Sequence, residues 1–116
     1  MRKHLSIALF SLFLTSACSP KISSAIIKDY DALKYDQKVV VLELNQKQPV
    51  NAEVLGHVKI RDTGFSTKCN YDIVLDKAKL EARRVGGNTI KITKHKKPDL
   101  WSTCHRLDVT ILKIDS

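Results

Sequence analysis

Residues 70–88 read NYDIVLDKAKLEARRVGGN, and this stretch decides the fold. Its apolar residues recur at helical spacing and so share one face of a helix: Tyr71, Val74, Leu75, Ala78, Ala82 and Val85. Asn70 is suited to cap the start, where Asp72 adds a favourable negative charge. Gly86 and Gly87 supply a left-handed stop. The stretch therefore predicts one amphipathic helix whose apolar face packs on another layer.

Segments with strand patterns lie on both sides of this helix. Two precede it and two follow it: 39–44, 54–60, 88–93 and 105–114. The order β-β-α-β-β predicts an α+β fold, in which one helix packs on a small mixed sheet. Leu42, Leu112 and Ile114 indicate that the far face of this sheet is partly apolar too.

The first residues have the order of a bacterial secretory signal. Arg2 and Lys3 precede an uncharged stretch, residues 5–14, which is too short to span a bilayer because a spanning helix needs about 20 residues. Small residues then lead to Cys18, and this order resembles the bacterial lipobox. The resemblance implies cleavage before Cys18, a diacylglyceryl thioether on its sulfur and an acyl chain such as palmitate on the new amino terminus. The alternative is a secreted protein cut near Ala17, with Cys18 a plain thiol.

The domain organisation follows from this signal. Residues 1–17 are predicted to be the signal peptide, and their removal from the 116-residue chain leaves 99 residues, enough for one small domain. Residues 18–36 mix Ser, Lys, Asp and Tyr around one short apolar patch, and we expect them to form the lipidated N-terminus and a tether. Residues 37–116 are predicted to be a single α+β domain. The expected location is the cell envelope, lipid-anchored, in the outer membrane.

The cysteines are Cys18, Cys69 and Cys104. If lipidation uses Cys18, an even pair remains, and in an oxidising envelope such a pair is more often a disulfide than two free thiols. Chain-entropy estimates give a bridge of this loop length roughly 3–4 kcal/mol. That would be a large share of the net stability of a small domain.

The chain is basic, with a formal net charge of +8 that falls to +6 when Arg2 and Lys3 leave with the signal. Export separates the protein from nucleic acid, and no pattern of basic and aromatic residues indicates nucleic-acid binding. The charge favours anionic envelope partners, such as lipid head groups, glycolipid phosphates or acidic proteins. The alternative is a solvated lysine-rich surface without a partner.

Several positions across residues 53–112 form a familiar pattern: Leu55-Gly56-x-Val58, Cys69 just before the helix, Ala78-x-x-x-Ala82-x-x-x-Gly86-Gly87-Asn88 running into a strand, and Cys104 opening the last strand. The pattern resembles the folded domain of the RcsF family of outer-membrane stress-sensor lipoproteins. It also resembles the YbjQ-type group of small domains, whose proposed role is heavy-metal binding. The resemblance implies a Cys69–Cys104 disulfide and alanines that let the helix lie close to the sheet. The RcsF domain has a second disulfide and a Pro-rich tether, which this sequence lacks.

Metal binding is an alternative for the residues that carry borderline-soft ligand atoms: His57, His95, His105, Cys69 and Cys104. They show no Cys-x-x-Cys or His-x-x-x-His spacing, and adjacent residues such as Cys104 and His105 point to opposite faces of a strand. We therefore expect a disulfide, solvent-facing histidines and no cofactor.

The sequence also lacks the patterns typical of catalysis. It contains no Gly-x-Ser-x-Gly elbow, no paired-carboxylate pattern and no phosphate-binding loop. An oxidised cysteine pair offers no thiolate for His105 to activate. We therefore expect a protein that is not an enzyme.

Residues 94–101, KHKKPDLW, have the composition of a recognition loop. Lys96 and Lys97 could engage an anionic partner, with Trp101 as the anchor. The alternative is that Trp101 packs over the Cys69–Cys104 bridge and the lysines are only solvated. The sequence thus predicts an envelope lipoprotein that acts as a binding or interaction module. A metal-binding or metal-sensing domain and an accessory subunit for outer-membrane protein assembly are the alternatives.

Overall fold

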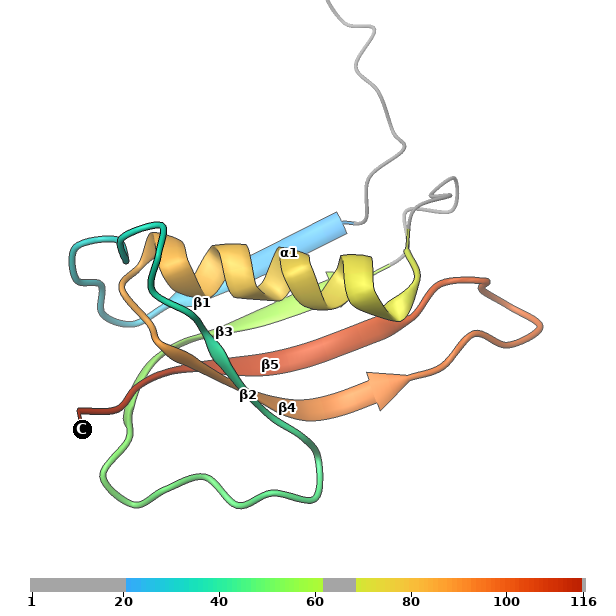
Figure 1. Ribbon diagram of the computed structural model, residues 1–116. Coiled ribbons are helices and arrows are strands. Elements are labelled where there is room, and N and C mark those ends of the chain that lie inside the picture. Colours follow the sequence, from blue (N-terminus) through green and yellow to red (C-terminus); the bar gives the residue numbers. More distant parts are fainter. Residues whose placement is uncertain (1–20, 62–68, 116) are drawn as a thin grey trace, which may run out of the picture.

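The computed structural model describes residues 21–61 and 69–115 (Figure 1). The predicted signal peptide, residues 1–17, and the predicted lipidation site, Cys18, lie outside the described residues. The described chain forms these elements in order: β1 (Lys21–Ile26), β2 (Val40–Leu42), β3 (Glu53–Arg61), α1 (Tyr71–Arg84), β4 (Thr89–Lys96) and β5 (Arg106–Lys113). The predicted α+β class is confirmed, with a strand at the start that was not predicted.

The strands form one mixed sheet in the order β1-β3-β5-β4-β2. Neighbouring strands are antiparallel, except for the parallel pair of β2 with β4. Because β3 and β4 both run antiparallel to β5, they are parallel to each other, and α1 connects them past the strand between. The helix lies across one face of the sheet (Figure 1).

The helix has the start and the stop that the sequence predicts. The Asn70 side chain accepts a hydrogen bond from the Ile73 N–H at 3.0 Å. At the other end Gly86 adopts φ +84°, a left-handed conformation that glycine takes without steric cost. The helix buries Val74, Ala78 and Ala82 against the sheet.

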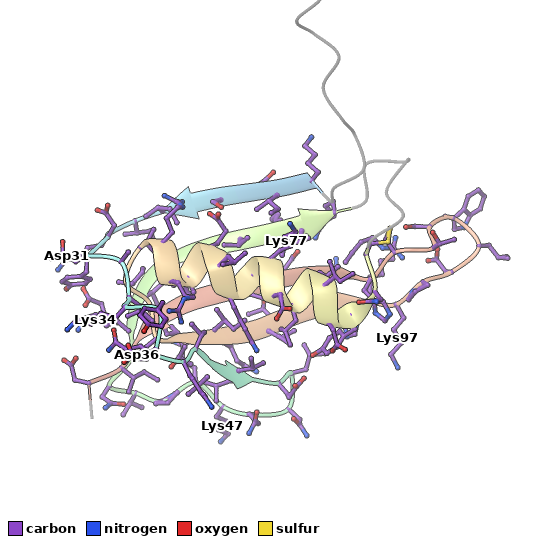
Figure 2. The ribbon with its side chains drawn as sticks, turned by 45° about the horizontal axis from the view of Figure 1, so that its top comes forward. Asp31, Lys34, Asp36, Lys47, Lys77 and Lys97 are labelled. Atoms are coloured by element: carbon purple, nitrogen blue, oxygen red, sulfur yellow. A yellow bond between two sulfur atoms is a disulfide. The ribbon has the colours of Figure 1, made fainter. Side chains whose placement is uncertain are left out.

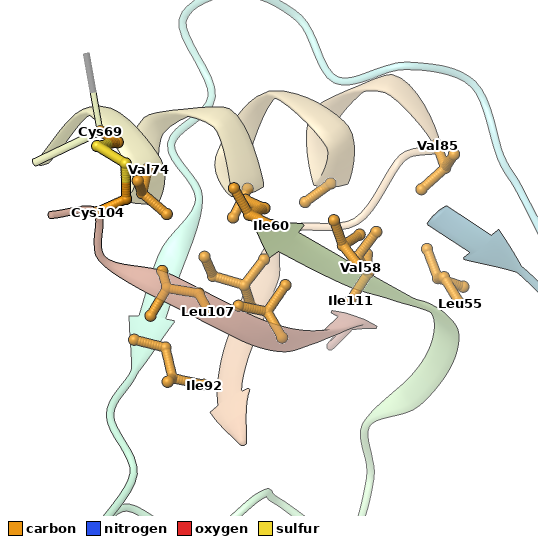
Figure 3. Packing of buried hydrophobic residues seen from close by; sticks show 14 residues of the cluster. Leu55, Val58, Ile60, Cys69, Val74, Val85, Ile92, Cys104, Leu107 and Ile111 are labelled. Atoms are coloured by element: carbon orange, nitrogen blue, oxygen red, sulfur yellow. A yellow bond between two sulfur atoms is a disulfide. The ribbon is translucent and has the colours of Figure 1, made fainter. Parts of the chain in front are cut away.

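The core lies between the helix and the sheet (Figure 3). The strand register aligns Val58 of β3 with Val109 of β5, and Val109 with Ile92 of β4, in one row. Each such side chain gains roughly 1.5–3 kcal/mol from burial. The largest fully buried side chains are Leu55, Ile60, Ile90, Ile92, Leu107, Ile111, Leu112, Val58, Val74, Val85, Val109 and Cys104. Small residues at 78 and 82 let the helix approach this layer closely.

The segment predicted to be a tether is instead built into the fold. Residues 21–26 form edge strand β1, which pairs with β3 along its whole length. Beyond it, the Tyr30 N–H donates to the Val85 carbonyl at 2.9 Å and the Leu33 N–H to the Arg83 carbonyl at 3.0 Å. Carbonyls at a helix C-terminus have no partner within the helix, so this segment supplies their donors. The predicted boundary near residue 37 is therefore wrong, and the domain includes residues from Lys21 onward.

The other strands differ from the prediction mainly in length. Strand β2 is only three residues long, whereas β4 extends to Lys96, into the segment expected to be loop. On the far side of the sheet, Leu112 is buried, while Leu42 and Ile114 are half-buried beside a groove next to β2. The far face is thus partly apolar, as expected.

Candidate interaction surface

The β4–β5 loop (residues 97–105) projects from the end of the sheet where the helix begins (Figure 1). Its tip carries two large apolar side chains in solvent, because Leu100 is 97% exposed and Trp101 is 90% exposed. The alternative in which Trp101 packs over the disulfide is therefore wrong. An exposed tryptophan next to an exposed leucine is unusual for a surface without a partner.

The tip is held in a defined turn by Asp99. Its carboxylate oxygen Oδ1 accepts the N–H groups of Trp101, at 2.9 Å, and Ser102, at 3.0 Å. The Asp99 N–H donates in turn to the Ser102 carbonyl at 2.8 Å. The Trp101 N–H is the main reason why the pKa of Asp99 lies below its ordinary value. The backbone of the turn is thus satisfied internally, which leaves Leu100 and Trp101 directed to solvent.

The base of the loop is also fixed. Arg106 Nη2 donates to the Lys97 carbonyl at 2.9 Å and lies 3.3 Å from the Asp99 carboxylate. Cys69 and Cys104 form a disulfide with a Cα–Cα distance of 5.0 Å, which ties the start of the helix to the end of the loop. The predicted disulfide is therefore confirmed, and both of its cysteines are buried.

Exposed lysines lie at the base of the loop. Lys94 and Lys96 lie at the end of β4, and Lys97 begins the loop (Figure 2). Among the described residues, none of these three lysines forms an ion pair. The predicted residues Lys96, Lys97 and Trp101 thus lie on one loop and its base, with their side chains accessible.

Two histidines meet beside the helix start, which the sequence did not predict. His95 Nε2 lies 2.9 Å from His105 Nδ1, and the Tyr71 ring stacks on His95 at a centroid distance of 5.0 Å. Burial, followed by the proximity of His105, lowers the pKa of His95 below its ordinary value. Only the hairpin register could have revealed this pair, because the two residues lie ten positions apart.

The third predicted candidate ligand lies elsewhere. His57 is on β3, where its Nδ1 is 3.2 Å from the Thr110 hydroxyl. Cys69 and Cys104 are bonded to each other, so neither offers a thiolate to a metal. Among residues 21–61 and 69–115, no group of three or more His, Cys, Asp or Glu side chains is placed to hold a metal ion.

The surface combines an exposed aromatic and an exposed aliphatic side chain at its tip with exposed lysines at its base, a combination suited to binding. In the described part of the chain, no helix is long and apolar enough to cross a membrane. No protein-family model, no curated protein and no solved structure matches this chain.

Proposed function

We propose that this protein is a lipid-anchored component of the bacterial cell envelope that acts as a non-enzymatic interaction module. The order of charge, apolar length and small residues before Cys18 supports the anchor. The observation that carries the interaction role is the 90% exposure of Trp101 in a turn that Asp99 holds. Tryptophan is enriched among residues that dominate binding energy, and preorganisation lowers the entropy lost on binding.

The partner that this surface would bind is anionic. Lys96 and Lys97 lie at the base of the loop, and positive charge both steers and orients anionic partners. Anionic lipid, glycolipid phosphate and an acidic envelope protein share this chemistry. A stress-sensing role of the RcsF kind would use the same loop to detect a change in what it contacts.

The test places a photo-reactive amino acid at position 101 in living cells. We expect crosslinked products that a matched probe at Val50, also fully exposed but on another loop, does not give. Equal yields from the two positions would remove the β4–β5 loop as the contact surface. The anchor is tested separately by mass spectrometry of the mature protein, where Cys18→Ser should abolish both lipid attachment and membrane recovery.

Metal binding is the second candidate, and the His95–His105 pair favours it. Two imidazole nitrogens 2.9 Å apart have a separation that one Cu²⁺ or Zn²⁺ ion could bridge, with water completing the coordination. Titration of the purified protein with Cu²⁺ should then show binding that His105→Ala removes and His57→Ala preserves. If His57→Ala weakens binding equally, or if no binding occurs, this candidate is wrong.

A further inference from the structure

We propose that the end of the domain bearing the β4–β5 loop lies directly on the anionic lipid surface of the membrane that holds the anchor. The proposal deepens the proposed function, and it rests on lipidation of Cys18. It commits to a lipid surface as the partner of Lys96, Lys97 and Trp101. The domain is therefore oriented by its own surface as well as held by its acyl chains.

Four neighbouring strands have a basic terminal residue at this one end of the sheet. Strand β1 begins with Lys21, β3 ends with Arg61, β5 begins with Arg106 and β4 ends with Lys96. The register shows that these ends are level: Lys21 pairs with Arg61, Lys96 pairs with Arg106, and the β3–β5 register continues to the pair Ile60 and Leu107 beside them. The alignment makes a row of cations across the end of the sheet.

Among the described residues, carboxylates pair only with the two arginines of this row. Arg61 lies 2.6 Å from the Asp108 carboxylate, and Arg106 lies 3.3 Å from that of Asp99. Four lysines at this end form no ion pair among the described residues: Lys21, Lys94, Lys96 and Lys97. Clustered lysines next to an anchor are attracted to the negative potential of an anionic leaflet.

The opposite end of the domain differs in charge. There Asp31 and Asp36 lie beside Lys34, while Lys97 lies at the far side of the molecule (Figure 2). Mixed charge at that end gives no comparable attraction to an anionic surface. The charge distribution therefore favours one orientation of the domain over its reverse.

Leu100 and Trp101 project from the same end. Tryptophan is enriched where a membrane meets water, because its ring is apolar and its indole N–H is polar. Leu100 adds an aliphatic side chain that is 97% exposed. Apolar side chains at the tip and lysines around its base are the arrangement that interfacial membrane binding uses.

The proposed anchor lies close in sequence to this end of the domain. Cys18 precedes Lys21 by three residues, which span at most about 10 Å even when fully extended. Strands are spaced by about 4.8 Å, so β4 lies roughly 14 Å from β1 across the sheet. Because β1 belongs to the sheet, its first residue and the level ends of β3, β5 and β4 must stay close to the membrane.

Trp101 itself is the reporter, since it is the sole tryptophan of the chain. The mature lipidated protein is reconstituted into vesicles of phosphatidylglycerol and phosphatidylethanolamine that contain brominated acyl chains. We expect the Trp101 emission to be shifted to the blue and quenched by bromine. In vesicles of phosphatidylcholine alone, quenching should be weaker because the lysines lose their attraction.

A matched pair of variants separates charge at this end from charge in general. Lys96→Ala with Lys97→Ala should lower the ratio of domains in contact with the lipid surface to domains free of it roughly 30-fold. This corresponds to about 1 kcal/mol per lysine. Lys34→Ala with Lys47→Ala removes the same charge from exposed positions away from Lys97 and should leave quenching unchanged (Figure 2).

Each contrary result has its own meaning. Suppose that mass spectrometry confirms the lipid but Trp101 is unquenched, with the emission typical of water. The loop would then not contact the lipid surface, while the anchor and a protein partner would remain possible. Equal quenching in neutral vesicles, or in the Lys96 and Lys97 double variant, would overturn an anionic surface as the partner. Absence of lipid on Cys18 would contradict both the proposed anchor and the proposed contact of the domain with the lipid surface.

Discussion

At the scale of single residues, the tightest constraints lie where the chain passes closest to a neighbouring segment. A Cβ atom at Gly86 would lie 2.7 Å from the Asp31 carbonyl oxygen, and one at Gly87 would overlap with Ile111 Cγ2. Gly86 thus ends the helix and also admits the segment that follows β1, whereas Gly87 admits Ile111 of β5. The second role of Gly86 depends on residues more than fifty positions away, and the helix pattern carries no sign of it.

Gly86→Ala is expected to lower the free energy of unfolding by about 2 kcal/mol or more. The left-handed φ of +84° alone costs an alanine about 1–2 kcal/mol, and the contact with Asp31 adds to it. Urea unfolding measures the change. Leu80→Ala, on the exposed side of the same helix, should stay within about 0.5 kcal/mol of the parent chain. Similar losses in the two variants would contradict the constraint at Gly86.

His95 should make stability depend on pH. Burial and His105 lower its pKa in the folded state below the ordinary value of 6.5, so folding favours the neutral ring. The stabilisation is complete above about pH 6.5 and is lost as the pH falls through the lower, folded-state pKa. Proton NMR of the His95 ring measures this pKa, and His105→Ala should raise it because one of its causes is removed. A His95 pKa at or above 6.5 would contradict the effect of partial burial beside His105.

At the scale of elements, the sequence predicts best those helices and strands whose signals lie within one short stretch of residues. Helix α1 was predicted almost to the residue, because its stripe, its Asn70 cap and its Gly86 stop lie within one short stretch. Strand β1 was missed, since its residues are almost all exposed and its pairing with β3 joins residues thirty or more positions apart. An edge strand needs backbone hydrogen bonds to one neighbour, which leave little trace in apolar periodicity.

Strand β1 can be recognised by its backbone protection. In hydrogen–deuterium exchange, we expect slowed amides within residues 21–26, because antiparallel pairing with β3 engages part of their N–H groups. A tether would exchange at the rate of an unstructured peptide throughout. The exposed residues Lys47 and Gln48 serve as the internal reference for fast exchange. Uniformly fast exchange in residues 21–26 would contradict the strand.

The disulfide should be the strongest single link between elements. Cys69→Ala with Cys104→Ala is expected to lower the free energy of unfolding by roughly 3–4 kcal/mol, the loop-entropy value for a sequence separation of 35. Urea unfolding of the double variant measures the loss. A reducing agent should destabilise the parent chain by a similar amount and leave the variant unchanged. If the reducing agent had no effect on the parent chain, the bridge would contribute nothing measurable.

At the scale of the whole molecule, the domain begins earlier than its apolar pattern indicated. Residues 27–36 run from β1 past the C-terminal end of the helix, where Arg83 donates to the carbonyls of Lys34 and Gln37. The sheet, the helix end and this segment share contacts and should unfold together. In the proposed lipoprotein, Cys18 precedes Lys21 by only three residues of sequence, so its anchor would keep the domain close to the membrane.

Removal of the first strand should therefore destabilise the entire domain. A chain of residues 37–116 is expected to lose about 2 kcal/mol or more relative to residues 19–116, because Ile26 leaves the core and the edge of β3 is uncovered. Thermal unfolding followed by circular dichroism compares the two chains. Equal midpoints would show that residues 19–36 behave as a tether after all.

The sequence by itself determined the α+β class and the position of the helix, which follow from short-range periodicity and from caps within a few residues. It also predicted the Cys69–Cys104 bridge, on the expectation that lipidation uses Cys18. Only the tertiary structure decided that β1 joins the sheet, that His95 meets His105 and that Trp101 stands in solvent. Each of these depends on which distant segments lie side by side, because strand register and loop geometry are set by the packed sheet and not by the residues on either side.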